Sequence, residues 1–304
     1  MTNSNKVVFF GSGPVAAKSL HLLKKNFDIE AVITKPKPAH HKESFPVIEE
    51  CEANNITYLT CKNRDELSDL ISKNTFQSKV AVLIDFGIIV TQDVIDAFKM
   101  GIVNSHFSVL PDLRGADPIT FAILSGQKTT GVSLMLLVEK MDEGPLIAYG
   151  EYELPKDITT PLLTEHLIQF SDKLLSLELP KYIADKHTSP QTVTGRAVSY
   201  SRKLTKQDGL IDWEKPAEVI ERQIRAFIDW PKSYTKLANI DVIITDVKIS
   251  KAKGRPGDTA VIDKQLIVFC GQDSIIINRL IPSGKKEMDA SAFINGHHDY
   301  FVSS

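Results

Sequence analysis

Short apolar runs alternate with helix-like segments through the first half of the chain. The runs at residues 6–10, 30–34, 80–84 and 101–105 have the length and composition of buried strands. Helical patterns at residues 16–25, 46–54 and 64–73 separate them, and Thr91 is a plausible N-cap for another helix through Phe98. This alternation predicts an α/β fold with a doubly wound, mostly parallel, Rossmann-like sheet.

The second half of the chain changes character. Apolar strands at 132–138 and 145–154 lead into a long amphipathic helix at 160–183, and residues 184–204 are polar. Beyond a helix at 216–227, short Val- and Ile-rich runs at 242–247, 259–262, 266–269 and 274–280 are separated by turn residues. This spacing predicts a small antiparallel, OB-like β-barrel. We therefore expect a catalytic domain over 1–186, a linker over 187–204 and a barrel domain over 205–304.

Composition limits the class of protein. The three cysteines form no C-x-x-C pair, which argues against a zinc site and a disulfide framework and fits a reducing compartment. No apolar run approaches the roughly 20 residues of a membrane span. No signal peptide is visible, so we expect a cytoplasmic protein. Residues 1–186 carry 24 acidic and 19 basic side chains, whereas residues 187–304 carry 14 and 17. That basic C-terminal part fits an anionic macromolecule, or ordinary variation, equally well.

Asn104 and His106 stand at the end of the 101–105 run, with Asp142 further along the chain. In an open α/β sheet, strand ends are where ligands bind. An amide can donate hydrogen bonds to a developing oxyanion, an imidazole can donate a proton, and a carboxylate sets the charge and tautomer of that imidazole. These groups suit the transfer of a formyl unit between nitrogens. For an isolated Asn–His pair, a structural role in a loop is the competing interpretation.

Residues 11–16 match the dinucleotide-binding pattern G-x-G-x-x-A after a strand. A nicotinamide enzyme needs an acidic residue at the end of the second strand, where this chain has Thr34 and Lys35. Pro14 also removes a backbone donor from the loop. A glycine turn that lets a helix pack closely on the sheet is therefore the favoured interpretation.

Several segments together resemble the folate-dependent formyltransferases. These are Asn104 and His106, the Ser108–Pro111 loop, the Arg114-Gly115 step, and Asp142 before Gly144. The similarity covers nearly the whole chain. Three C-terminal segments, at 211–213, 230–233 and 282–288, most resemble the members of this family that formylate methionyl initiator tRNA.

The resemblance implies a set of functional residues. Asn104, His106 and Asp142 would be catalytic. The donor, 10-formyltetrahydrofolate, would contact Asp85, Phe86, Gly87, Ile88, Ser108, Val109, Leu110 and Pro111. The acceptor, initiator methionyl-tRNA, would contact Val15, Lys37, Lys42, Arg114, Lys203 and Lys206. It further implies a monomer that needs no metal.

Two departures from the family pattern keep the acceptor open. The loop at residues 35–42 is shorter than the basic loop with which the family grips the tRNA acceptor end, and Val15 stands where the family usually has a larger aromatic. Formyl transfer to an amino sugar on a nucleotide, hydrolysis of formyltetrahydrofolate, and an RNA-binding module without chemistry are the alternatives. A dehydrogenase would rest on the glycine loop alone.

Overall fold

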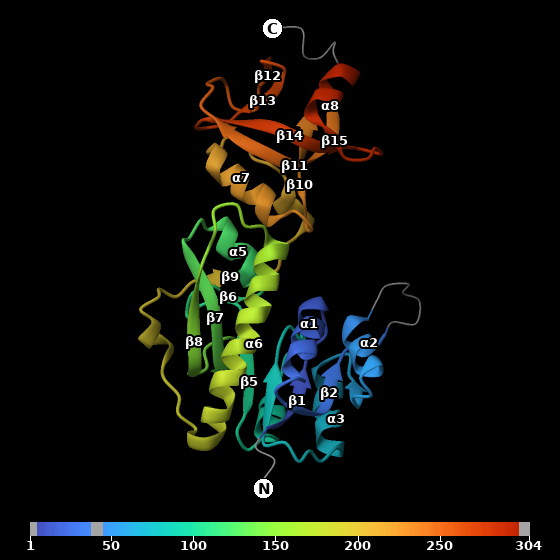
Figure 1. Cartoon of the computed structure of the whole chain (residues 1–304), viewed down its shortest axis with the longest axis vertical. Helices are drawn as coiled ribbons and strands as arrows, with labels where there is room; N and C mark the ends of the chain where they lie inside the picture. The colour runs from blue at the N-terminus through green and yellow to red at the C-terminus, as the bar shows by residue number, and fades with distance from the viewer. Residues whose placement is uncertain (1–4, 38–44, 298–304) are drawn as a thin grey trace. The chain divides into compact units, whose positions relative to one another are not determined.

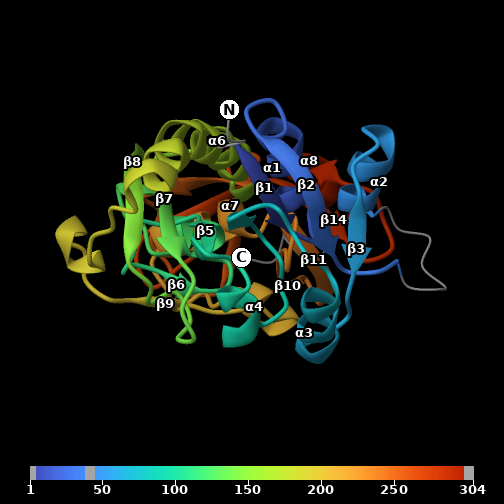
Figure 2. The same cartoon turned by 90° about the horizontal axis from the view of Figure 1, so that it is seen from below.

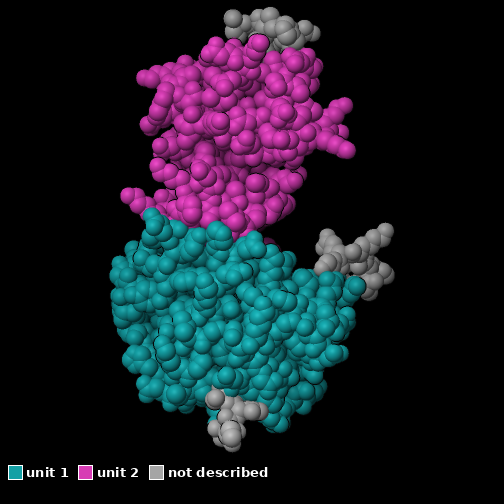
Figure 3. Space-filling model, viewed as in Figure 1, with its two compact units in different colours: residues 1–118, 129–153, 164–201 teal, residues 119–128, 154–163, 202–304 magenta. Residues whose placement is uncertain are grey.

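The computed structural model describes residues 5–37 and 45–297 (Figure 1). The chain divides into two compact units (Figure 3). The first unit holds residues 1–118, 129–153 and 164–201, and the second holds residues 119–128, 154–163 and 202–304. Most of the segment that we expected to be a linker, residues 187–201, therefore lies in the first unit.

The first unit is built on a mostly parallel sheet, as predicted. Its strand order is β3-β2-β1-β4-β5-β7-β8, with β7 and β8 antiparallel. The strands are β1 (Lys6–Phe10), β2 (Asp28–Thr34), β3 (Tyr58–Thr60), β4 (Val80–Leu83), β5 (Ile102–His106), β7 (Thr129–Leu136) and β8 (Leu146–Glu153). The order reverses between β1 and β4, and such a switch point opens a crevice at the carboxyl ends of the strands. A short parallel pair, β6 (Arg114–Gly115) and β9 (Tyr200–Ser201), lies apart from this sheet.

Helices lie on both faces of the sheet (Figure 2). One face carries α1 (Pro14–Leu23), α2 (Pro46–Ala53) and α6 (Thr160–Asp185), and the other carries α3 (Arg64–Lys73) and α4 (Gln92–Asp96). Alternate residues of each strand point to opposite faces. On the face of α3 and α4, the Phe10 ring packs edge-on against Phe86 and Phe98, with centroids 5.4 and 5.9 Å apart. Both faces are covered, which explains why the central strands read as continuous apolar runs.

The second unit contains an antiparallel sheet, as predicted, in the order β10-β11-β14-β13-β12, with β15 paired to β14. Its strands are β10 (Ser233–Leu237), β11 (Ile240–Ser250), β12 (Thr259–Ile262), β13 (Gln265–Phe269), β14 (Ser274–Pro282) and β15 (Met288–Asp289). The helices are α5 (Pro118–Leu124), α7 (Ala217–Ala226) and α8 (Ala290–Gly296). Ile220 and Ile224 of α7 and Phe293 of α8 enter one core with the strands. Closure of this sheet into a barrel stays a prediction.

The three cysteines are free and buried. Burial raises the pKa of the Cys51 thiol to about 12 and that of Cys61 to about 11, so neither is a ready nucleophile. Within the described residues, no helix combines the length and hydropathy that a membrane crossing requires.

Candidate active site

Asn104 and His106 lie at the carboxyl end of β5, a buried strand inside the sheet. They lie two residues apart, so their side chains leave the same side of the strand. Their exposed fractions are only 8% and 7%. The Asn104 amide takes part in none of the hydrogen bonds found among the described residues, so it is available to a ligand. Its neighbours across the sheet are Leu83, at the end of β4, and Met135 of β7.

The imidazole of His106 lies between a carbonyl and a carboxylate. Its Nε2 is 2.9 Å from the carbonyl oxygen of Leu113. A carbonyl only accepts hydrogen bonds, so Nε2 carries a proton. The other nitrogen, Nδ1, lies 3.9 Å from Oδ2 of Asp142. That separation is longer than a hydrogen bond, and it places the carboxylate beside the ring.

Asp142 is held in an uncommon backbone conformation. Its φ is +54°, a left-handed value that costs a non-glycine residue of order 1 kcal/mol or more. Its Oδ2 accepts a 2.7 Å hydrogen bond from the backbone N–H of Gly115. Gly115 itself has a φ of +99°, and a Cβ there would lie 2.4 Å from the carbonyl oxygen of Ser201. The hydrogen bond to this carboxylate therefore comes from a glycine, and the backbone of Ser201 leaves no room for a larger residue at that position.

The loop expected to line the donor pocket follows β4. The backbone N–H of Ser12 donates to the carbonyl of Asp85, which ties this loop to the glycine turn after β1. A Cβ on Gly13 would lie 2.2 Å from Oδ2 of Asp85, so the glycine permits close packing. Phe86 is 1% exposed and belongs to the core, whereas Asp85 and Gly87 are exposed and Ile88 is half-buried. Their contact with a donor stays a prediction.

The second predicted donor segment, Ser108–Pro111, is buried inside the first unit. The Ser133 hydroxyl donates to the carbonyl of Ser108 and accepts from the N–H of Leu110, at 2.8 and 2.9 Å. Val109 and Leu110 are at most 1% exposed. Ser133 is the residue that pairs with His106 across the sheet, so the segment is tied to the strand beside β5. Its direct contact with a donor stays a prediction.

The expected acceptor residues are dispersed. Lys203 and Lys206 are exposed in the second unit, and Lys37 is exposed with its ammonium 5.7 Å from the centre of the Phe45 ring. Val15 is half-buried in the first turn of α1. Lys42 lies outside the described residues. The proposed contacts of these residues with tRNA stay predictions.

Arg114 is turned toward the protein. Its guanidinium donates to Oε1 of Gln191 at 2.7 and 3.2 Å and lies 3.3 Å from a carboxylate oxygen of Glu143. Gln191 donates in turn to the backbone of Asp142. Sequence reasoning missed Gln191, which stands in a polar stretch without periodicity; no local signal could have found it.

Asp85 carries an altered acidity. The residue as a whole is exposed, but its carboxyl packs against Gly13 of the glycine turn. Loss of water around that carboxyl raises the pKa of Asp85 to about 6; the positive charge of Lys35 opposes the shift, and the negative charge of Asp117 adds to it. The folded chain therefore holds the proton of Asp85 more tightly than the unfolded chain. Its contribution to stability falls as pH rises from about 4 to about 6 and stays low above that range.

We expect Asp85→Asn to raise the melting temperature at pH 7.5 and to leave it nearly unchanged at about pH 3, where the carboxyl is mostly protonated in both states. Scanning calorimetry at both pH values measures the difference. Asp185→Asn, an exposed carboxylate at the end of α6, is the control and should show no such dependence. An equal shift for Asp85→Asn at both pH values would contradict the assignment.

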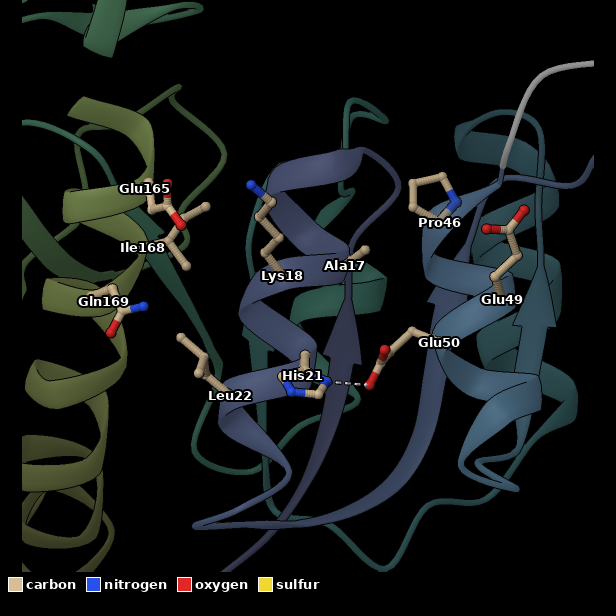
Figure 4. A pocket seen from close by; sticks show the side chains of 10 residues that line it. All are labelled: Ala17, Lys18, His21, Leu22, Pro46, Glu49, Glu50, Glu165, Ile168 and Gln169. Carbon is tan, nitrogen blue, oxygen red and sulfur yellow. Dashed lines mark hydrogen bonds and ion pairs between the residues drawn. The ribbon is translucent and has the colours of Figure 1, made fainter. Parts of the chain in front are cut away.

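A separate hollow of about 510 Å³ lies between α1, α2 and α6 (Figure 4). His21 and Glu50 meet across it at 3.0 Å, and Lys24 also reaches Glu50 at 2.7 Å. Its lining contains none of Asn104, His106 and Asp142. It is therefore distinct from the candidate active site.

An amide, an imidazole and a carboxylate thus converge at the end of a central strand, an arrangement suited to acyl transfer. Two family models match the chain, "Formyl transferase" over residues 5–179 and "Formyl transferase, C-terminal domain" over residues 203–298. The chain belongs to the formyl transferase family and is an enzyme of that class.

Its relatives include the methionyl-tRNA formyltransferase of Geobacillus sp. (strain WCH70), which is 33% identical over 96% of this chain and 94% of that protein. The methionyl-tRNA formyltransferase of Bacillus subtilis (strain 168) is 29% identical over 96% of this chain and 95% of its own. Among solved structures, an N-formyltransferase from Helicobacter canadensis, in complex with folinic acid and dTDP-3-aminofucose, superposes with a TM-score of 0.67 at 18% identity. The superposition covers 90% of this chain and 98% of the Helicobacter canadensis chain. At 18% identity, the similarity is one of fold.

Proposed function

We propose that this enzyme transfers the formyl group of 10-formyltetrahydrofolate to the α-amino group of methionyl initiator tRNA, in the cytoplasm, for translation initiation. The observation that carries the proposal is the convergence of Asn104, His106 and Asp142 in one unit. The near full-length similarity to two methionyl-tRNA formyltransferases supports the acceptor. Because the three side chains come from one chain, a monomer suffices.

The reaction begins when the free amine of the methionyl ester attacks the formyl carbon. A C–N bond forms and the carbonyl oxygen becomes an oxyanion. The Asn104 amide and the Nδ1–H of His106 donate hydrogen bonds to it, because Nε2 of His106 is already engaged by Leu113. One such donor is commonly worth about 10²–10³-fold in rate. The intermediate then collapses, the bond to N10 of the folate breaks, and the product amide remains on the methionine.

Two protons must move during this reaction. The attacking amine loses one, and N10 of the departing folate gains one. The imidazole of His106, whose Nδ1 faces Asp142, donates the proton that N10 gains, with the carboxylate beside the ring. Asp142 can also assist removal of the amine proton through water. The nucleophile is already an amine, so the pathway needs neither a covalent enzyme intermediate nor a metal.

The second unit would contribute affinity for the tRNA through phosphate contacts. Lys203 and Lys206 are exposed there, as such contacts require. Phosphate contacts position a nucleic acid and weaken with salt because counterions are released on binding.

A second acceptor deserves a test of its own. The N-formyltransferase from Helicobacter canadensis, which shares the fold, was crystallised with an amino-sugar nucleotide. The short segment at residues 35–42 favours this alternative, since it offers fewer basic groups to a tRNA. Hydrolysis of the donor, with water as acceptor, would use the same three side chains.

The proposal is tested with labelled 10-formyltetrahydrofolate and charged initiator methionyl-tRNA. We expect label on the charged tRNA and none on the same tRNA whose amine has been acetylated beforehand. KM for the tRNA should rise with salt while kcat changes little. Labelling of the acetylated tRNA, or no labelling of the free amine, would contradict the proposed reaction.

A further inference from the structure

The turn that carries Asp142 is held from the far side by residues much later in the chain. Gln191 opens the short 3₁₀ helix η1 (Gln191–Thr194), 49 residues after Asp142. Its side chain is 7% exposed. Nε2 donates to the backbone carbonyl of Asp142 at 2.7 Å and to that of Gly144 at 3.0 Å. One amide group thus joins both sides of the turn.

Every polar atom of the Gln191 side chain is engaged. Both N–H groups are used by the two carbonyls, and Oε1 accepts from Nε and Nη2 of Arg114. Arg114 also lies 3.3 Å from Glu143, the residue after Asp142. Two carbonyls demand donors and a guanidinium demands an acceptor, so only one orientation of the amide satisfies all of them. Gln191 and Arg114 therefore clamp the turn in one conformation.

The turn needs such a clamp. Asp142 has a positive φ, a conformation that persists only where the surroundings determine it. The carboxylate must reach both the N–H of Gly115 and the neighbourhood of His106. A small rotation of this backbone would move Oδ2 away from Nδ1, and catalytic groups tolerate little displacement.

The same late segment also supports the other side of His106. The N–H of Leu113 donates to the hydroxyl of Ser199 at 2.8 Å, and the Thr194 hydroxyl donates to the carbonyl of Leu110 at 2.9 Å. Leu113 is the residue whose carbonyl accepts from Nε2 of His106. Residues 189–201 thus hold both partners of the imidazole.

We infer that Gln191 is a positioning residue for the formyl-transfer reaction, which acts by holding the backbone of Asp142 so that its carboxylate faces His106. The inference rests on the proposed function. A purely structural role, in which Gln191 only ties residues 189–201 to the first unit, would affect stability but not the step that Asp142 serves.

The test is a double-mutant cycle between Gln191 and Asp142. Gln191→Leu removes all four hydrogen bonds, and Gln191→Glu keeps an acceptor for Arg114 but cannot donate to the two carbonyls. We expect each to lower kcat about 10- to 100-fold, with KM for 10-formyltetrahydrofolate changed less than about threefold. In an Asp142→Ala background, the same substitutions should lower kcat by less than about threefold, because the group that they misplace is gone.

Gln169→Leu, an exposed glutamine on α6, is the matched control and should leave kcat unchanged. Circular dichroism verifies that each variant is folded; if Gln191→Leu is not, Gln191→Glu carries the test. An undiminished kcat in folded Gln191 variants, or an equal loss in both backgrounds, would overturn the inference. If Asp142→Ala alone keeps full kcat, the proposed role of Asp142 fails instead.

Discussion

Replacing Asn104 with Ala should lower kcat for formyl transfer about 10²–10³-fold. The substitution removes an amide that lies beside His106 at the end of β5 and is free to donate to the oxyanion. Folding should be nearly unaffected, because that amide makes none of the hydrogen bonds found among the described residues. Initial rates at saturating donor and acceptor measure kcat, and thermal unfolding measures stability.

Asn54→Ala is the matched control. Asn54 follows the last residue of α2 as its C-cap and hydrogen-bonds Glu50 and Lys24, away from β5. It should lose some stability and keep its kcat. A near wild-type kcat for Asn104→Ala would mean that the oxyanion is stabilised elsewhere.

Gly144→Ala should destabilise the first unit by about 3 kcal/mol or more, a large effect for one methyl group. The added Cβ would lie 1.7 Å from the carbonyl oxygen of Leu136. The two nearest atoms both belong to the backbone of Leu136, which cannot move aside as the end of a flexible side chain could. The same shift would disturb Asp142, so kcat should fall as well. Denaturant midpoints at constant m measure the change in stability.

Gly195→Ala measures the cost of a left-handed backbone conformation without the steric clash expected at Gly144. Gly195 has a φ of +67°, but a Cβ there meets nothing within 4 Å. Its loss should be of order 1 kcal/mol, from the left-handed backbone alone. Equal losses at positions 144 and 195 would show that the approach to Leu136 is not what requires the glycine.

The sequence could predict the sheet because its signals are local. The continuous apolar runs at β1, β4 and β5 reflect burial on both faces, and the helical periods between them reflect helices on both sides. β10 was missed because two of its three buried residues, Ser233 and Thr235, are polar, so the segment lacks the apolar alternation that marks a strand. α8 was missed because a helix of seven residues is too short to show a clear helical periodicity in the sequence.

The candidate site was predictable only in part. Asn104 and His106 follow from their place at a strand end, and Asp142 followed from resemblance. The expected contact of Arg114 with the tRNA stays a prediction, and its contacts with Gln191 and Glu143 were not foreseen. Gln191 lies 49 residues from Asp142 and 77 residues from Arg114, so no local sequence pattern indicates that they are in contact. Polar clamps of this kind are decided by tertiary packing.

The most direct test compares kcat/KM of the wild-type enzyme for three acceptors with 10-formyltetrahydrofolate as donor. These are charged initiator methionyl-tRNA, a dTDP-linked amino sugar, and water alone. We predict that the tRNA is preferred by at least about 10³-fold over the sugar, the discrimination reached when a site is built for one partner's polar groups. Transfer to the sugar at a higher kcat/KM, or donor hydrolysis that the tRNA does not accelerate, would contradict the proposed acceptor while leaving the proposed roles of Asn104, His106 and Asp142 in place.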